Sequence, residues 1–194
     1  MTSRYIAFDV DGVLIDTDAV HYDALNRALH DAVGVLAVIT PHEHATRFKG
    51  LPTRIKLAAL LEMGRLTVHQ VSHVGELKRM YTRQGLRTVP HDPRKVELFR
   101  ALRKRGFRCG ACSNAIRDSV LVMLDVARVA WAMEFVLSNE DAAPKPSPEM
   151  YLKAAARFGI APDQLIVVED GAPGIASAEA ARARNRGKMI GTGV

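Results

Sequence analysis

The sequence predicts an α/β protein with a doubly wound, Rossmann-like parallel sheet and an inserted all-α helical cap. From residue 89 to residue 194, short apolar segments alternate with segments of helical periodicity, which favours parallel strands covered by helices. Residues 17–88 instead contain consecutive helical patterns. A further apolar strand precedes this block. We therefore expect residues 1–16 and 89–194 to form an α/β catalytic core around a helical cap at 17–88.

Local signals place the individual elements. The expected strands cover residues 5–10, 107–112, 135–138, 165–168 and 188–191. The expected core helices cover residues 93–105, 117–129, 149–159 and 175–184, and those of the cap begin at 18, 41, 53 and 67. Proline in the first turn, at Pro41 and Pro93, fits a helix start, and a glycine past the last turn, at Gly64, Gly106 and Gly159, fits a helix end.

Composition excludes several classes of protein. The 194 residues contain no run of 18 apolar residues, which predicts no membrane span. The N-terminus lacks the long apolar stretch of a signal peptide, and two cysteines are too few for a disulfide scaffold. We therefore expect a cytoplasmic protein that does not bind membranes.

The net charge of +6 suits anionic partners. Most basic residues are expected at helix ends and on helix faces, however, and no aromatic residues are interleaved with the basic runs as a stacking platform for bases requires. This pattern disfavours nucleic acid and favours a solvated basic surface.

Polar residues follow the ends of several expected strands. One more, Lys145, lies in the loop before the helix expected at 149–159. In an open parallel sheet, ligands bind beyond the carboxyl ends of the strands, so these residues are expected in one crevice. They are Asp9, Asp11, Ser113, Asn114, Lys145, Glu169 and Asp170.

This set of side chains is suited to phosphoryl transfer. The carboxylates of Asp9 and Asp170 can bind a hard cation such as Mg²⁺. A carboxylate can also attack phosphorus and form an aspartyl-phosphate. Asp9 and Asp11 are two residues apart on an extended segment and share one face, so one can attack while the other handles the leaving-group proton. Lys145 and the Ser113 hydroxyl can neutralise and orient phosphoryl oxygens.

The same residues lie in motifs that resemble those of the haloacid dehalogenase superfamily, in particular its capped phosphatases and β-phosphoglucomutase-like group. The four segments, in chain order, are FDVDGVLID at 8–16, CSNA at 112–115, KPSP at 145–148 and VEDG at 168–171. The helical block matches the cap that this family inserts after its first motif. The resemblance therefore implies the same fold and a Mg²⁺-dependent hydrolase.

The resemblance also implies roles for the residues in these motifs. Asp9 would be the nucleophile, and Asp11 the general acid and then base. The phosphoryl group would be held by Ser113, Asn114 and Lys145. Magnesium would be bound by the Asp9 carboxylate, the Asp11 backbone carbonyl and Asp170, with Glu169 beside them.

Several residues that have no assigned role in the motifs have two interpretations. The cap block carries six of the seven histidines and a charge of +4, from 10 basic and 6 acidic residues. His21, Lys49 and Arg54 are therefore candidate substrate contacts, although a solvated helix surface explains them equally well.

Asp16 and Asp18 are expected to be helix caps. Cys109 and Cys112 have a redox or metal spacing, but on a strand they face opposite sides, which favours two buried thiols.

The leading functional hypothesis is a cytoplasmic phosphatase acting on a small phosphorylated metabolite, as a monomer or weak homodimer. A sugar phosphomutase would use the same catalytic residues and is the alternative. From another class, a non-catalytic phospho-accepting or binding domain is disfavoured because Asp9, Asp11 and Lys145 are all present.

Overall fold

The computed structural model describes residues 4–185, which separate into two compact units. One unit contains the described residues up to Asp16 and those from Pro90 onward, and the other contains residues 17–89. Among the helices of residues 4–185, none is long and apolar enough to cross a membrane.

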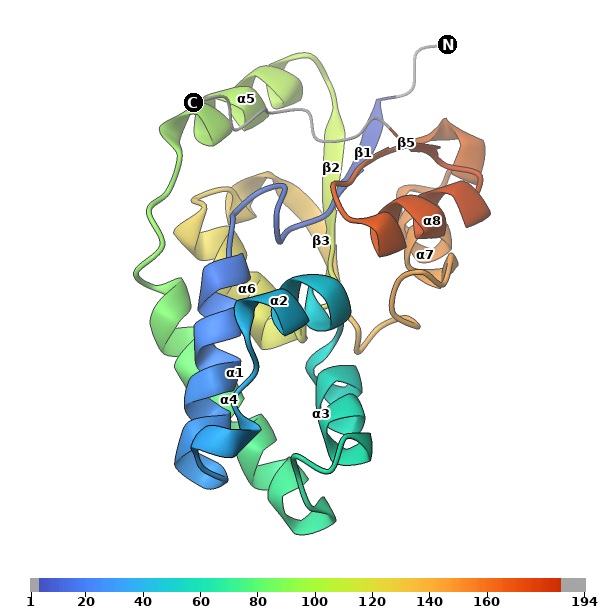
Figure 1. Cartoon of the computed structure of the whole chain (residues 1–194). Coiled ribbons are helices and arrows are strands. Elements are labelled where there is room, and N and C mark those ends of the chain that lie inside the picture. Colours follow the sequence, from blue (N-terminus) through green and yellow to red (C-terminus); the bar gives the residue numbers. More distant parts are fainter. Residues whose placement is uncertain (1–3, 186–194) are drawn as a thin grey trace. The chain divides into compact units, whose positions relative to one another are not determined.

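The first unit is built on a parallel sheet with the strand order β3-β2-β1-β4-β5 (Figure 1). The strands are β1 Tyr5–Phe8, β2 Arg108–Cys112, β3 Met133–Leu137, β4 Leu165–Val168 and β5 Arg184–Asn185. In the register of the three central strands, Phe8 lies opposite Ala111 on one side and Val168 on the other. Because these strands are parallel and end at nearly the same level, the residues that follow them meet at one edge of the sheet.

Helices cover both faces of this sheet. They are α5 Pro93–Lys104, α6 Arg117–Val126, α7 Glu149–Phe158 and α8 Ala172–Ala180, with 3-10 turns η3 Ala130–Ala132 and η4 Pro162–Gln164. Side chains alternate between the faces, so Ala7 of β1 packs in a buried cluster with α7 and α8, whereas Phe8 makes an edge-to-face contact with Phe99 of α5. The centroids of these two rings lie 5.0 Å apart.

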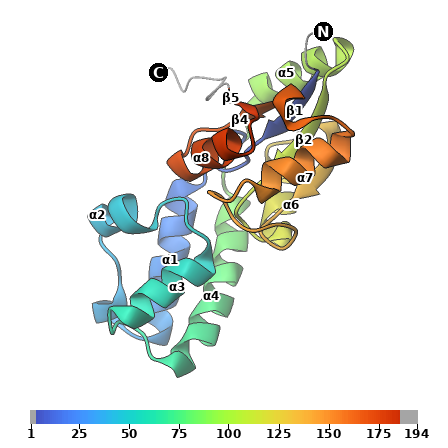
Figure 2. The same cartoon turned by 90° about the vertical axis from the view of Figure 1, so that its right-hand side faces the viewer.

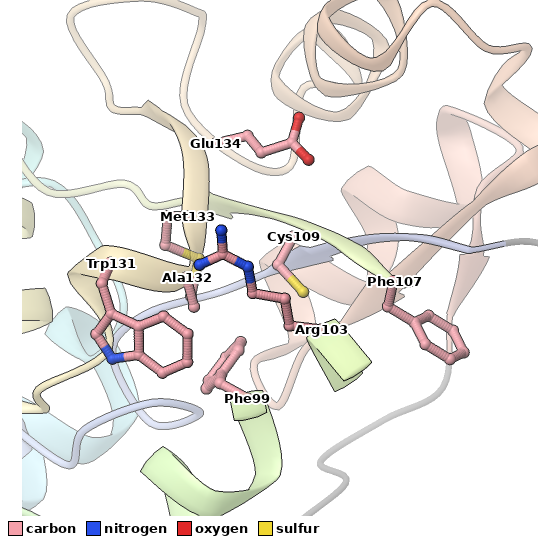
Figure 3. Close-up of a pocket in the computed structure, with 8 residues that line it drawn as sticks. All are labelled: Phe99, Arg103, Phe107, Cys109, Trp131, Ala132, Met133 and Glu134. Atoms are coloured by element: carbon pink, nitrogen blue, oxygen red, sulfur yellow. The ribbon is translucent and has the colours of Figure 1, made fainter. Parts of the chain in front are cut away.

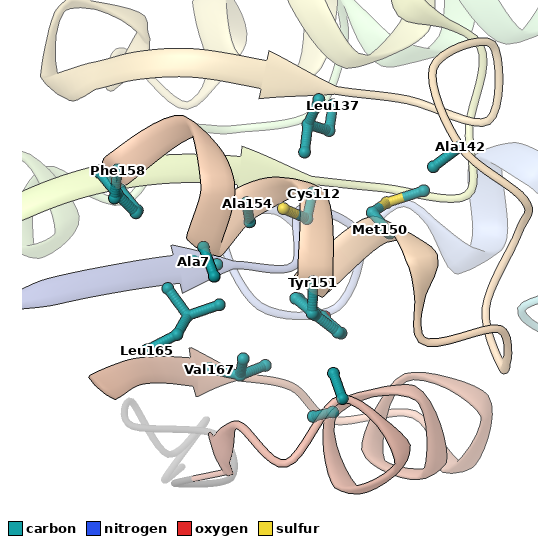
Figure 4. Close-up of a cluster of buried hydrophobic side chains, with 13 residues drawn as sticks. Ala7, Cys112, Leu137, Ala142, Met150, Tyr151, Ala154, Phe158, Leu165 and Val167 are labelled. Atoms are coloured by element: carbon teal, nitrogen blue, oxygen red, sulfur yellow. The ribbon is translucent and has the colours of Figure 1, made fainter. Parts of the chain in front are cut away.

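The apolar layer between α7 and the sheet is the main core of this unit (Figure 4). Helix α7 contributes Met150, Tyr151, Ala154 and Phe158, all buried. These positions recur at intervals of three and four residues, which places them on one helical face. This packing fixes α7 and the loop before it relative to the strand ends.

The second unit is all-helical over residues 17–89 (Figure 2). Its elements are α1 Asp18–Ala32, η1 Val35–Ala37, α2 Pro41–Glu43, a π-helical turn η2 His44–Phe48, α3 Thr53–Glu62 and α4 Val68–Leu86. A separate buried cluster holds them together, and it includes Leu25, Leu29, Phe48, Leu60 and Val74.

The predicted fold class is confirmed, and several element boundaries differ from the sequence-based expectation. The helix expected from Pro41 is a single turn, α2, followed by a π turn. The helix expected at 175–184 begins at Ala172, because Pro173 is accommodated in the first turn, where no intrahelical N–H bond is lost. The last strand is at Arg184–Asn185, and the expected strand at 188–191 lies outside the described residues.

Candidate active site

The candidate site lies at the carboxyl edge of the sheet. Asp9 directly follows β1, Ser113 follows β2, and Glu169 follows β4. The backbone N–H of Asp9 donates to Val168 O (2.9 Å), and that of Ser113 donates to Leu137 O (2.9 Å). These bonds extend the parallel pairing by one residue and hold the polar side chains at the strand ends.

Lys145 is the central residue of this site. Its side chain is 3% exposed, and its ammonium donates to three acceptors: Asp9 Oδ1 at 2.6 Å, Glu169 Oε1 at 2.5 Å and Cys112 O at 2.9 Å. An ammonium has three N–H donors, so each donor has an acceptor in this arrangement. The sequence separations of 136, 24 and 33 residues show that the fold, and not local sequence, brings these groups together.

Asn114 fixes the backbone of Lys145. The amide N–H of Lys145 donates to Asn114 Oδ1 (2.8 Å), and Asn114 Nδ2 donates to Lys145 O (3.2 Å). The Asn114 carbonyl in turn accepts from Asn139 Nδ2 (2.7 Å). The side-chain amide of Asn114 therefore holds the lysine loop against the end of β2, a task that the sequence did not indicate.

Burial and neighbouring charges shift the pKa values of Asp9 and Lys145. Burial raises the pKa of Asp9 to about 8, and the carboxylates of Glu169 and Asp11 add to this, although Lys145 opposes it. Burial alone would lower the pKa of Lys145, but the carboxylates of Asp9 and Glu169 outweigh burial and raise it. Lys145 is thus a permanent cation, whereas Asp9 needs further positive charge nearby to remain ionised at neutral pH.

A cation bound by three nearby carboxylates could supply that positive charge. Oxygen atoms of Asp9, Glu169 and Asp170 all lie within 4.8 Å of one another. Asp9 and Glu169 are buried, whereas Asp170 is exposed. Carboxylate oxygens are the donors that Mg²⁺ prefers, so the chemistry of this cluster fits a hard divalent cation.

A tight turn places Asp11 beside this cluster. The amides of Leu14 and Ile15 both donate to Val10 O, at 2.9 and 3.1 Å, and Gly12 N donates to Ile15 O at 2.7 Å. The turn reverses the chain directly after β1 and keeps Asp11 close enough to Asp9 to raise its pKa.

Ser113 is buried, at 2% exposed, and its Oγ accepts a hydrogen bond from Ala115 N at 3.1 Å. As an acceptor in this bond, the hydroxyl keeps its hydrogen for donation to another group. A phosphoryl oxygen is such an acceptor.

The two cysteines are free and buried on opposite faces of β2. Cys112 packs in the cluster beneath α7, whereas Cys109 lines a small hollow on the α5 side, together with Phe99, Arg103 and Trp131 (Figure 3). Burial raises the pKa of each thiol to about 12, so neither is a thiolate at neutral pH.

The helical unit contains its own cluster of basic side chains. Lys78 Nζ lies 3.2 Å from His21 Nδ1, and Lys56 and Lys78 are both buried. Burial, followed by the charges of Lys78, Lys56 and His44, holds the pKa of His21 well below its usual value. His21 is therefore a neutral ring whose Nδ1 accepts from Lys78. His21 was predicted from the sequence, whereas the two lysines were not, because they have no distinguishing local pattern.

The other two cap candidates are exposed. Lys49 Nζ donates to Asp18 Oδ2 (3.0 Å), and Arg54 lies on α3, two residues before the buried Lys56. The interpretation of Asp18 as a helix cap is wrong: Thr17 is the N-cap residue, and the Asp18 carboxylate pairs with Lys49 and with His44 Nε2 at 2.8 Å. Asp16 is likewise not the residue at the N-cap position.

A sheet of this topology, with acidic residues at its carboxyl edge and a buried lysine between two of them, defines an α/β enzyme core suited to anion chemistry. A family model of haloacid dehalogenase-like hydrolases matches residues 4–182. The chain therefore belongs to the haloacid dehalogenase-like hydrolases, and the resemblance seen in the four motifs is confirmed.

Individual relatives agree with this assignment. The chain is 27% identical over 181 residues to a phosphorylated carbohydrates phosphatase of Thermotoga maritima, covering 91% of this chain and 80% of the relative. It is 26% identical over 185 residues to the fructose-1-phosphate phosphatase YqaB of Escherichia coli, covering 93% and 95%. The crystal structure of CbbY from Rhodobacter sphaeroides in complex with phosphate superposes with a TM-score of 0.83 at 20% identity, covering 96% and 86%. The chain is a phosphoric monoester hydrolase of haloacid dehalogenase type.

Proposed function

We propose that this protein is a Mg²⁺-dependent phosphatase that hydrolyses a small phosphorylated metabolite through an aspartyl-phosphate on Asp9. The observation that carries the proposal is the contact of 2.6 Å between Asp9 Oδ1 and Lys145 Nζ, beside the Asp170 carboxylate. A buried nucleophile next to a fixed cation and a divalent-cation site is what attack on an anionic phosphate ester requires.

Two displacements at phosphorus make up the reaction. First, a carboxylate oxygen of Asp9 forms a bond to phosphorus while the bond to the ester oxygen breaks, and protonated Asp11 gives its proton to the leaving oxygen. Second, the oxygen of a water molecule bonds to phosphorus while the Asp9–phosphorus bond breaks, and Asp11 takes the proton from that water. The products are an alcohol and inorganic phosphate, and both aspartates return to their initial states.

The other side chains bind and orient the phosphoryl group. Lys145 and the Ser113 hydroxyl contact its oxygens, and Asn114 acts by holding the Lys145 backbone in place. Asp9 and Asp170, with the Asp11 backbone carbonyl, would hold Mg²⁺, and Glu169 supports the site through Lys145. When bound, the cation would keep Asp9 ionised and neutralise phosphoryl charge.

Basic side chains of the helical unit are proposed to bind the part of the substrate that does not react. His21, Lys49 and Arg54 are the candidates from the sequence, and the buried Lys56 and Lys78 next to His21 join them. A neutral imidazole among lysine ammonium groups suits a substrate with anionic or hydroxyl groups.

The test is a phosphate-release screen of the purified protein with Mg²⁺ over sugar phosphates, other small phosphate esters and an aryl phosphate. Asp9→Asn should abolish release, because an amide does not attack phosphorus, and Asp163→Asn on the exposed turn η4 is the matched control. Mass spectrometry of acid-quenched protein should locate a phosphoryl group on Asp9. More than a few per cent of the original activity in Asp9→Asn would refute the assignment of the nucleophile.

A further inference from the structure

We propose that Tyr151 is a positioning residue of the active site, which holds Lys145 against Asp9 by acting through Glu169. The inference rests on the proposed function, because it concerns how the phosphate-binding lysine is kept in place. Tyr151 lies on α7, outside the four motifs, and its hydroxyl donates to Glu169.

The hydroxyl of Tyr151 has a polar partner in an otherwise apolar layer. The residue is completely buried in the cluster between α7 and the sheet (Figure 4), and its hydroxyl donates to Glu169 Oε1 at 2.5 Å. Its neighbours on the same helical face are Met150, Ala154 and Phe158. A phenylalanine ring would fill the same space, so packing alone does not require the hydroxyl.

The same carboxylate oxygen also accepts from Lys145. Both Tyr151 Oη and Lys145 Nζ donate to Glu169 Oε1, and Lys145 Nζ lies 5.2 Å from the centroid of the Tyr151 ring. Tyr151 therefore contacts both members of the ion pair: its hydroxyl contacts the carboxylate and its ring face attracts the ammonium.

Glu169 is held from a second direction by the backbone of α8. A β-carbon built on Gly174 would lie 2.0 Å from the Glu169 carboxylate, so the helix approaches that group as closely as a glycine allows. With α8 on one side and the Tyr151 hydroxyl donating to Oε1, the carboxylate has a fixed orientation. Any side chain larger than glycine at 174 would displace it.

The position of Glu169 affects Asp9 because both carboxylates share the Lys145 ammonium. Lys145 donates to both Asp9 and Glu169, and a buried carboxylate that loses a donor attracts its remaining donor more strongly. Without the Tyr151 hydroxyl, Glu169 would draw Lys145 away from Asp9 and from the phosphoryl oxygens. The lysine would still be bound and charged, but it would be displaced from the position that the transition state needs.

Loss of the Tyr151 hydroxyl should therefore lower turnover and leave substrate affinity nearly unchanged. Tyr151→Phe should lower kcat for an aryl phosphate about tenfold, within the range expected for a lost hydrogen bond to a charged group, with KM changed less than twofold. Tyr151→Leu should lose more, because the ring face is lost too. The matched control is Tyr22→Phe, which removes a hydroxyl bond to Ile39 O in the helical unit and should leave kcat unchanged.

A double-mutant cycle separates positioning from a general loss of structure. If Tyr151 acts through Glu169 on Lys145, Tyr151→Phe should have no further effect on the residual rate of Lys145→Ala. Wild-type kcat in Tyr151→Phe, or an equal loss in both backgrounds, would overturn the proposal. So would wild-type kcat in Glu169→Gln, a result that does not depend on the folding of a Tyr151 variant. Absence of phosphate release by the wild-type protein would instead refute the proposed function, and this inference with it.

Discussion

Gly12 and Asp170 approach so closely that no other residue type fits at position 12. A β-carbon on Gly12 would lie 2.3 Å from Asp170 Oδ2, and the backbone there has φ +89°, a conformation that disfavours L side chains. Gly12 directly follows Asp11, and Asp170 directly follows Glu169. The glycine thus lets the turn after β1 and the end of β4 come together at the proposed cation site.

Gly12→Ala should weaken metal binding at the proposed site. The methyl group would push the Asp170 carboxylate away, and displaced groups at a metal site typically reduce metal affinity roughly 10–100-fold. We expect a rise of that size in the Mg²⁺ concentration for half-maximal phosphatase activity.

The matched control for this variant is Gly159→Ala. Gly159 has φ +70° and no atom within 4 Å of its β-carbon position, so alanine there also has an unfavourable positive φ but meets no clash. An equal shift of the Mg²⁺ dependence in both variants would show that strain, and not the Asp170 contact, is responsible.

Lys145→Ala should reduce kcat by about two to three orders of magnitude, the effect of losing one preorganised charge at a transition state. The variant also leaves Asp9 and Glu169 buried without their shared cation, so some loss of thermal stability is expected. Lys104→Ala, at an exposed lysine near the end of α5, is the control and should keep full activity. A change of less than tenfold in Lys145→Ala would place this lysine outside the reaction.

The acid limb of the pH profile should depend on the Mg²⁺ concentration. Burial raises the pKa of Asp9 to about 8, so without a cation this carboxyl is mostly protonated at neutral pH and cannot attack phosphorus. Because protons and the cation compete for the same carboxylate, more Mg²⁺ should shift the limb to lower pH, by up to about one pH unit per tenfold concentration. Profiles of kcat/KM at several Mg²⁺ concentrations test this, and a limb that does not move would contradict it.

The raised pKa of Asp9 also makes the stability of the folded protein depend on pH. A carboxyl whose pKa is raised in the folded state stabilises the protein while it is protonated in both states. That contribution is lost as the pH rises from about 4, where the unfolded chain ionises, to about 8. The metal-free protein should therefore become less stable over this range, and Asp9→Asn should flatten the dependence in thermal unfolding experiments.

Residues at strand ends were predictable because the rules that place them are local. An apolar run followed by Asp9, or by Glu169 and Asp170, indicates a strand with carboxylates at its carboxyl end, and a parallel sheet brings such ends together. The sequence therefore predicted that these carboxylates lie together. It did not indicate that the Lys145 ammonium donates to both Asp9 and Glu169.

The residues that the sequence did not reveal depend on packing between distant elements. Tyr151 occupies an apolar position of an amphipathic helix, and only the fold places its hydroxyl against Glu169. Lys56 and Lys78 have the sequence pattern of solvated lysines, but the packing of the helical unit buries both. Asn114 was predicted at the site, but its partner is the backbone of a residue 31 positions away.

The helical unit should select the substrate without taking part in the bond-breaking steps. We expect Lys49→Ala and Arg54→Ala to raise KM for the preferred substrate several-fold, because each removes a cation that can contact its non-reacting part. Hydrolysis of a small aryl phosphate, which lacks that part, should be unchanged. Equal losses on both substrates would show that these residues do not act in substrate selection.

A phosphatase and a sugar phosphomutase would use Asp9 and Asp11 in the same way. The two activities differ in the acceptor of the phosphoryl group: water in the first, and a sugar hydroxyl in the second. A mutase must exclude water and hold a sugar in two orientations, which needs many fitted hydroxyl contacts. The candidate contacts of the helical unit are mostly long basic chains and a histidine, which suit an anionic or small substrate better.

We therefore expect net release of inorganic phosphate without a bisphosphate primer. Purified protein with Mg²⁺ and a hexose 1-phosphate, followed by phosphorus NMR, distinguishes the two activities directly. Conversion to the 6-phosphate with little free phosphate, stimulated by the hexose bisphosphate, would overturn the phosphatase assignment. It would leave the proposed roles of Asp9, Asp11 and Asp170 intact, because both reactions pass through the same phosphorylated aspartate.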